Sequence, residues 1–137
     1  MTFSKEEIAK MARGTLLESL GIEITKRNEE QIEGTMPVDK RTVQPYGVLH
    51  GGATVALAET LGSFGSHLLI DTEKEQSYGV EVNCNHLKSV REGLVRGVAT
   101  IVHKGRKTHI WNIEVFNETG DLVAISRITV IIVPKRA

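Results

Sequence analysis

The chain has 137 residues, a typical length for one domain and enough to form a hydrophobic core without disulfides or metals. Hydrophobic residues make up 40% of the chain and charged residues 25%, a balance that excludes disordered and fibrous proteins. Basic and acidic residues number 17 each, so no overall charge attracts nucleic acid or anionic lipid. We therefore expect neither a nucleic acid nor a membrane as a partner.

Signals for the cellular compartment are few. Cys84 is the one cysteine, so no internal disulfide can form, which fits a reducing compartment. The N-terminal residues 1–14 are charged and lack the apolar stretch of a signal peptide. No apolar run approaches the roughly 18 residues that a membrane helix needs. We expect a cytoplasmic protein in which residues 1–137 form a single domain.

A helix followed by a β-hairpin is predicted at the start of the chain. Ser4 and Glu7 have the spacing of a capping box, and the apolar residues after them recur at helical spacing, with a weak point at Gly14. Apolar residues then alternate with polar ones on both sides of a polar turn at 28–30. This alternation indicates a hairpin over residues 22–36.

A long helix is predicted in the middle of the chain. Residues 37–49 contain two prolines and a glycine, and they favour an extended loop. Residues 51–69 are rich in alanine and leucine, which favour a helix although the glycines subtract some propensity. Because small or apolar residues occupy nearly every face of this helix, we expect it to be buried in the core.

The rest of the chain is predicted to form strands. Four segments are rich in β-branched or alternating apolar residues, and short polar turns separate them: 78–87, 94–103, 108–116 and 122–133. Short turns join antiparallel neighbours. The sequence therefore predicts an α+β domain in which a curved antiparallel sheet wraps one long buried helix.

Glu59 is the one acidic residue of the predicted long helix. An ionised carboxylate is rarely buried without a partner, because its removal from water is costly and raises its pKa. Glu59 either lies on a solvated stripe of the helix without a special role, or acts as a poised general base or nucleophile. In the second case Ser63, one turn later on the same face, could orient the carboxylate or an attacking water.

The loop before this helix reads QPYGVLHGG over residues 44–52. Free backbone N–H groups at a helix start, with the positive end of the helix dipole, can hold a carbonyl oxygen as negative charge develops on it. Gln44 and His50 offer side-chain donors nearby, and glycine at Gly51 lets a ligand approach the backbone. The alternative is that the two glycines only permit a tight turn into the helix.

The distance between Glu59 and the start of its own helix predicts a dimer. Glu59 follows His50 by nine residues, which is about 13 Å along a helix, whereas a catalytic carboxylate must come within roughly 3 Å of its target. A second copy with its helix antiparallel would bring one Glu59 opposite the other copy's Gly51. We therefore expect an active site shared across a two-fold interface, with Gln44, His50 and Gly51 from one subunit and Glu59 and Ser63 from the other.

Basic residues cluster at two predicted turns. They are either solvated turn charges or a phosphate-binding rim for a substrate that carries a nucleotide. The histidines show no zinc spacing and the cysteine is alone, so no metal site is expected. The two groups are Lys88, Arg91 and Arg96, and Lys104, Arg106 and Lys107.

Three segments resemble a known family. The segment TMPVDKRTVQPYGVLHGGATVALAETLGS is similar to the corresponding part of the hotdog-fold acyl-CoA thioesterases, and the likeness continues through YGVEVNCNHLKSVREGLVRG and WNIEVFNETGDLVAISRIT. The nearest branch contains 1,4-dihydroxy-2-naphthoyl-CoA thioesterase and the enterobactin-pathway proofreading thioesterase. The family's fold, a helix wrapped by an antiparallel sheet, matches the predicted elements.

The resemblance implies a role for individual residues. Glu59 matches the catalytic carboxylate, Gln44 and His50 match polar groups at the thioester, Gly51 matches the amide that polarises its carbonyl, and Ser63 matches the hydroxyl residue beside the carboxylate. Further positions match residues that contact the substrate, including its CoA portion: Gly79, His86, Leu87, Lys88, Ser89, Arg91, His103, Lys104, Gly105, Arg106, Lys107 and Thr108.

The implied reaction is hydrolysis of an aromatic CoA thioester, such as the dihydroxynaphthoyl thioester of menaquinone biosynthesis, with Glu59 as nucleophile or general base. No cofactor is implied, because CoA is part of the substrate. The family is usually a homotetramer, a dimer of dimers. Two alternatives are a non-catalytic acyl-CoA-binding module and a hotdog hydratase or dehydratase. Glu59 argues against the first, and the absence of a paired His and acid within the helix argues against the second.

Overall fold

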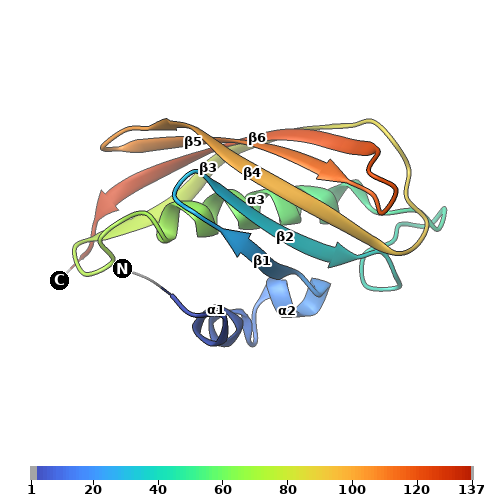
Figure 1. Ribbon diagram of the computed structural model, residues 1–137, viewed down its shortest axis with the longest axis horizontal. Helices are drawn as coiled ribbons and strands as arrows, with labels where there is room; N and C mark the ends of the chain where they lie inside the picture. Colours follow the sequence, from blue (N-terminus) through green and yellow to red (C-terminus); the bar gives the residue numbers. More distant parts are fainter. Residues whose placement is uncertain (1–2, 137) are drawn as a thin grey trace.

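A six-stranded antiparallel sheet curves around one long helix in the computed structural model, which describes residues 3–136 (Figure 1). This arrangement confirms the predicted α+β class. The helices are α1 (Lys5–Ala12), α2 (Leu16–Leu20) and α3 (Gly51–His67); the strands are β1 (Glu23–Arg27), β2 (Gln31–Pro37), β3 (Glu75–His86), β4 (Leu94–Lys104), β5 (Thr108–Phe116) and β6 (Leu122–Pro134).

The N-terminal helix is shorter than its apolar spacing suggests. The predicted capping box is present, since the side chain of Ser4 accepts from the backbone N–H of Glu7 and the Glu7 carboxylate accepts from the backbone N–H of Ser4. Gly14 then adopts a φ of 71°, a left-handed conformation that few other residues tolerate. The chain therefore divides into α1 and α2, which lie below β1 in Figure 1.

Glycines let α3 approach the sheet closely. A Cβ atom on Gly65 would lie 2.7 Å from the ring of Trp111 on β5, and one on Gly62 would overlap Ile128 on β6. The glycines that lower helix propensity are therefore needed for packing. The prediction that α3 is buried on all sides is wrong in part: its sheet-facing residues are buried, whereas Val55, Ala56 and the residues in register with them are half-buried.

The strand order is β1-β2-β4-β5-β6-β3, so the expectation that strands separated by short turns pair with each other is wrong for β3 and β4. Short turns do join β1 to β2, β4 to β5 and β5 to β6. However, β3 does not pair with β4, because β2 occupies that side of β4. The connection over residues 87–93 instead carries the chain across the end of the molecule, and β3 pairs with β6. One edge of β3 is thus left without a strand partner in the described chain.

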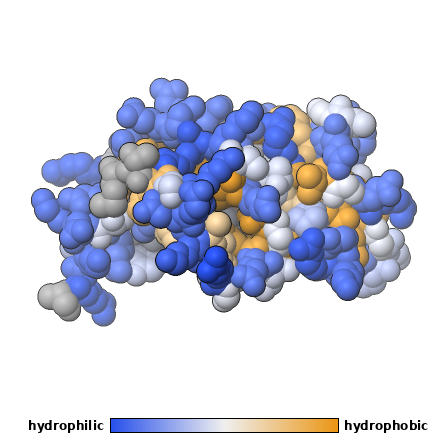
Figure 2. Space-filling view, turned by 60° about the horizontal axis from the view of Figure 1, so that its bottom comes forward, coloured by the Kyte–Doolittle hydropathy of each residue, from blue (hydrophilic) through white to orange (hydrophobic). Residues whose placement is uncertain are grey.

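The hydrophobic core lies between α3 and the concave face of the sheet. Its largest fully buried apolar side chains come from α3 and from the four strands β2, β4, β5 and β6: Trp111, Ile32, Met36, Leu57, Leu61, Ile113, Ile128, Val95, Val115 and Val130. Apolar surface also appears between hydrophilic side chains on the side shown in Figure 2. In residues 3–136, no helix is both long enough and apolar enough to cross a membrane.

Candidate active site

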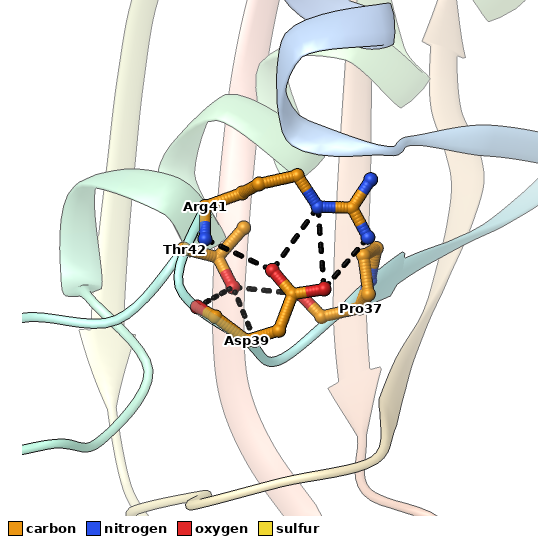
Figure 3. A network of polar contacts seen from close by, with 4 residues as sticks. All are labelled: Pro37, Asp39, Arg41 and Thr42. Atoms are coloured by element: carbon orange, nitrogen blue, oxygen red, sulfur yellow. Dashed lines mark hydrogen bonds and ion pairs between the residues drawn. The ribbon is translucent and has the colours of Figure 1, made fainter.

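A polar network anchors the loop between β2 and α3 (Figure 3). The hydroxyl of Thr42 donates to the carbonyl of Pro37 at 2.7 Å and accepts from the backbone N–H of Asp39 at 3.2 Å. The guanidinium of Arg41 donates to both carboxylate oxygens of Asp39 and lowers the pKa of that carboxyl to about 2. The backbone N–H of His50 donates to the carbonyl of Thr42 at 2.8 Å. The network thus fixes the loop directly before the start of α3.

Gln44 and His50, the two predicted donors, already make local hydrogen bonds. The Oε1 atom of Gln44 accepts from the backbone N–H of Tyr46. The Gln44 amide nitrogen makes no hydrogen bond within residues 3–136 and can donate to a ligand. The Nδ1 atom of His50 accepts from the backbone N–H of Gly52 at 2.7 Å, so His50 is the N-cap of α3. A neutral imidazole that accepts at Nδ1 carries its proton on Nε2. Both side chains therefore keep a nitrogen that can donate to a ligand.

Gly51 is the first residue of α3, where backbone N–H groups have no helical partner. The position that a Cβ atom would take on Gly51 lies 3.0 Å from Nε2 of His86, at the end of β3. The other ring nitrogen of His86 lies 3.9 Å from Sγ of Cys84. The missing side chain at Gly51 thus allows an imidazole and the free helix start to meet.

Glu59 lies half-way along α3 with its carboxylate against Gly79 of β3. Its Oε2 atom is buried and has no hydrogen-bond partner among residues 3–136. Burial raises the pKa of the Glu59 carboxyl above its usual value. The Glu59 residue as a whole is half-buried, but its Oε2 atom is shielded from water, and this is the environment expected of a poised base or nucleophile.

No hydrogen bond joins the side chains of Ser63 and Glu59 within residues 3–136, so a role for Ser63 in orienting the carboxylate or an attacking water stays a prediction. A different serine of α3 is engaged. The Oγ atom of Ser66 accepts from the indole N–H of Trp111 at 2.8 Å and lies 2.8 Å from Nδ1 of His109. This buried cluster was not predicted from the sequence.

The two basic segments lie at opposite ends of α3. His86 and the connection that carries Leu87, Lys88, Ser89 and Arg91 lie at the end where α3 begins. Lys104 instead lines a cavity of about 390 Å³ beside Gly65 and Leu68, near the end of α3, and the turn from His103 to Thr108 continues there. One chain therefore does not bring the predicted substrate-contacting residues together.

Two of the basic side chains are already paired. Lys88 forms an ion pair with Asp121 at 2.7 Å, and Arg96 forms one with Glu33 at 2.9 Å. By contrast, Arg91, Lys104, Arg106 and Lys107 make no ion pair within residues 3–136. The described residues also contain no group of three or more His, Cys, Asp or Glu side chains that could hold a metal ion.

Comparison with known proteins shows the family to which this chain belongs. The model of the thioesterase superfamily matches residues 46–124. A protein of Escherichia coli strain K12 named 1,4-dihydroxy-2-naphthoyl-CoA hydrolase is 46% identical over 125 residues, which cover 90% of each chain. The proofreading thioesterase EntH of Cronobacter turicensis is 45% identical over 85% of this chain and 84% of its own.

The fold matches solved structures of the same family. A variant of thioesterase PA1618 from Pseudomonas aeruginosa superposes with a TM-score of 0.96 at 41% identity, covering 98% of this chain and 97% of that chain. Thioesterase HI1161 from Haemophilus influenzae gives a TM-score of 0.93 at 42% identity, covering 98% and 93%. The chain therefore belongs to the thioesterase superfamily, has its hotdog fold and is a thioester hydrolase.

Proposed function

We propose that this hydrolase cleaves acyl-CoA thioesters, with an aromatic acyl group such as 1,4-dihydroxy-2-naphthoyl, to the free acid and CoA. The observation that carries the proposal is the buried carboxylate oxygen of Glu59, which has no hydrogen-bond partner within residues 3–136. It lies on the helix that begins at His50 and Gly51, directly after the loop that carries Gln44. The name of the Escherichia coli relative supports the aromatic substrate. Such a reaction belongs in the cytoplasm and in menaquinone biosynthesis.

The mechanism assigns one task to each group. The thioester carbonyl oxygen accepts from the backbone N–H of Gly51, assisted by Gln44 and His50, and these donors stabilise the negative charge of the tetrahedral intermediate. Glu59 either attacks the carbonyl carbon to give an anhydride, or removes a proton from an attacking water. In the first route a water then hydrolyses the anhydride, which releases the free acid and regenerates the Glu59 carboxylate. In both routes the carbon–sulfur bond breaks and the CoA thiolate takes up a proton. Oxygen-18 from solvent in Glu59 after one turnover identifies the anhydride route.

The geometry supports an active site shared between two subunits. Glu59 follows Gly51 by eight residues of α3, about 12 Å, so the two cannot act on one carbonyl within a chain. The free edge of β3 exposes 52% of Tyr78 and 54% of Val80, and long exposed edges are usually covered. We propose that β3 pairs with β3 of a second copy, which sets the two α3 helices antiparallel.

This dimer would also explain why the two predicted substrate-contacting segments lie at opposite ends of α3. In an antiparallel pair, the turn over residues 103–108 of one subunit approaches the start of α3 in the other. The unpaired cations of that turn then become candidates for binding the CoA phosphates. Two such dimers would form the homotetramer.

Mixed dimers test the shared site. Glu59→Ala removes the carboxylate, and Gly51→Pro removes the backbone N–H. Each variant alone should be inactive, and co-refolding equal amounts should produce heterodimers with one intact site. A return of roughly a quarter of the wild-type rate per dimer supports the arrangement, because half of the dimers are mixed and each has one of two sites. No return of activity contradicts it.

A panel of aryl- and alkyl-CoA esters tests the reaction itself. Release of free thiol with a preference for aryl esters is the expected result. Tight binding without thiol release would show a non-catalytic acyl-CoA-binding module. Addition or loss of water at the acyl chain, with the thioester intact, would show a hydratase or dehydratase.

A further inference from the structure

Gly79 lies on β3 directly against the carboxylate of Glu59. A Cβ atom placed on Gly79 would lie 3.0 Å from Cδ and 3.1 Å from Oε2 of Glu59, and closer still to Oε1. A real methyl group cannot coexist with a carboxylate at those distances. The position of the Glu59 carboxylate therefore depends on the absence of a side chain at residue 79.

The local geometry of β3 points this position inward. The pairing of β3 with β6 shifts register between Gly79 and Glu81, which leaves Val80 as the extra residue of a β-bulge. Bulges bend a strand and re-aim the residues beside them. Tyr78 and Val80 are more than half exposed, whereas Gly79 is half-buried and faces α3. Any side chain at residue 79 would therefore enter the space that the carboxylate occupies.

The carboxylate is held there by shape. Its Oε2 atom has no hydrogen-bond partner in the described chain, so no donor fixes this oxygen. The walls around it, with Gly79 as one of them, then limit the rotamers that the long Glu59 side chain can adopt. A displacement of about 1 Å at a catalytic group can lower the rate about 100-fold.

We propose that Gly79 is a positioning residue for hydrolysis, whose missing side chain provides the room that a glutamate at position 59 needs. The inference rests on the proposed role of Glu59 and adds a role for Gly79 that is separate from any contact with CoA. It implies that the sizes of residues 59 and 79 are coupled. In Glu59→Asp the carboxylate lies one methylene group closer to α3. This variant should therefore accommodate a methyl group at position 79.

A double-mutant cycle tests this coupling with four enzymes: wild type, Gly79→Ala, Glu59→Asp and the double variant. We expect Gly79→Ala to lower kcat about 100-fold in the Glu59 enzyme with little change in KM. In the Glu59→Asp enzyme the same change should lower kcat less than about threefold. An equal loss in both backgrounds would overturn the proposal, because a methyl group that acts only on β3 or on CoA binding does not sense residue 59.

A second measurement separates this proposal from the proposed reaction. The side-chain carboxyl carbon of Glu59, assigned with Glu59→Gln, is titrated by NMR in wild type and in Gly79→Ala. A carboxylate displaced toward water should titrate at a lower pH than in wild type. An unchanged titration overturns the proposal. A changed titration in a protein that hydrolyses no acyl-CoA supports the role of Gly79 and rejects the reaction.

A stability comparison keeps the test valid if Gly79→Ala folds poorly. Glu59→Ala removes the group that the new methyl would meet. Folding of the Glu59→Ala/Gly79→Ala protein with a Tm near that of Glu59→Ala supports the proposal. If Gly79→Ala and the double variant both fail to fold while Glu59→Ala folds, the proposal is overturned, since the methyl group would then clash with something other than Glu59.

Discussion

The ring Nδ1 of His50 accepts a hydrogen bond from the backbone N–H of Gly52 at 2.7 Å, so a side chain at the proposed carbonyl-binding site also caps the helix behind it. Histidine therefore has two separable tasks at this position. Nδ1 satisfies an N–H group of the first turn of α3, and Nε2 can donate to a substrate.

Substitutions at His50 should separate these tasks. Asparagine is a good N-cap, so His50→Asn should keep the free energy of unfolding within about 0.5 kcal/mol of wild type, whereas His50→Ala should lose about 1 kcal/mol. Both variants lose the Nε2 donor, and kcat/KM should fall about tenfold in each. Urea denaturation and steady-state kinetics measure the two effects. Full activity of His50→Asn would show that Nε2 contributes nothing.

Gly51→Pro and Gly51→Ala form a matched pair at the start of α3. Both add a Cβ atom about 3 Å from Nε2 of His86, but only proline removes the backbone N–H. Proline is well tolerated at the first position of a helix, so α3 should persist. We expect kcat of Gly51→Pro to lie about 10²- to 10³-fold below that of Gly51→Ala. Equal rates would show that the Gly51 amide does not bind the carbonyl oxygen.

Glu59→Gln tests the catalytic carboxylate. It should lower kcat about 10²- to 10⁴-fold. Because burial raises the pKa of Glu59, kcat/KM of the wild type should fall as the pH drops, with a midpoint above the usual glutamate value. Near-normal turnover of Glu59→Gln on every acyl-CoA would reject the assignment.

The raised pKa of Glu59 also predicts how the stability of the fold depends on pH. A carboxyl whose pKa is raised on folding favours the protonated form in the folded state, so its ionisation destabilises the fold as the pH rises through the folded-state pKa. Glu59→Gln resembles the protonated form at every pH. Its Tm should exceed that of wild type at about pH 8, and the difference should vanish below the usual glutamate pKa of about 4.3. An equal Tm at both pH values would contradict this.

Thr42 is expected to hold the loop that carries Gln44 and His50. It is 2% exposed and bonds to Pro37 and Asp39. Thr42→Val has nearly the same shape but leaves the Pro37 carbonyl without this partner, and should lower the free energy of unfolding by about 1–3 kcal/mol. Thr42→Ser keeps the hydroxyl and serves as the control. A loss in Thr42→Ser as large as in Thr42→Val would assign the effect to packing.

His109 should make stability fall in mild acid. It is 2% exposed, and its pKa is lowered by burial and also by the nearby charges of Lys104 and His103. Burial lowers the pKa of His67 as well. A histidine with a lowered pKa stabilises the fold above the unfolded-state pKa of about 6.5, and that contribution is lost as the pH falls toward the folded-state value. Urea denaturation from about pH 7 to pH 5 should show this decline.

His109→Asn is the matched variant, because its amide can replace Nδ1 beside Ser66 but does not titrate. Its free energy of unfolding should change less over the same pH range than that of wild type. A parallel decline in both proteins would assign the pH dependence to other groups, His67 first among them.

Local patterns were sufficient to predict most of the fold. The capping box at Ser4, the hairpin over 22–36 and the helix beginning at Gly51 depend on residues a few positions apart, and all are present. The place of β3 was not predictable in this way. Two strands, β2 and β3, could have paired with the same side of β4, and only the packing of the whole sheet decides between them.

The candidate site likewise has features that local patterns predict and features that depend on the whole fold. Glu59 and the donor-rich start of its helix could be selected as candidates from the sequence, because that choice depends on residue type and on spacing along one helix. By contrast, the folded chain was needed to show that Gly79 faces the Glu59 carboxylate and that residues 103–108 lie at the far end of α3. A one-residue bulge sets which side chains of β3 face the helix, and such a register depends on strand pairing between distant segments, which no local pattern encodes.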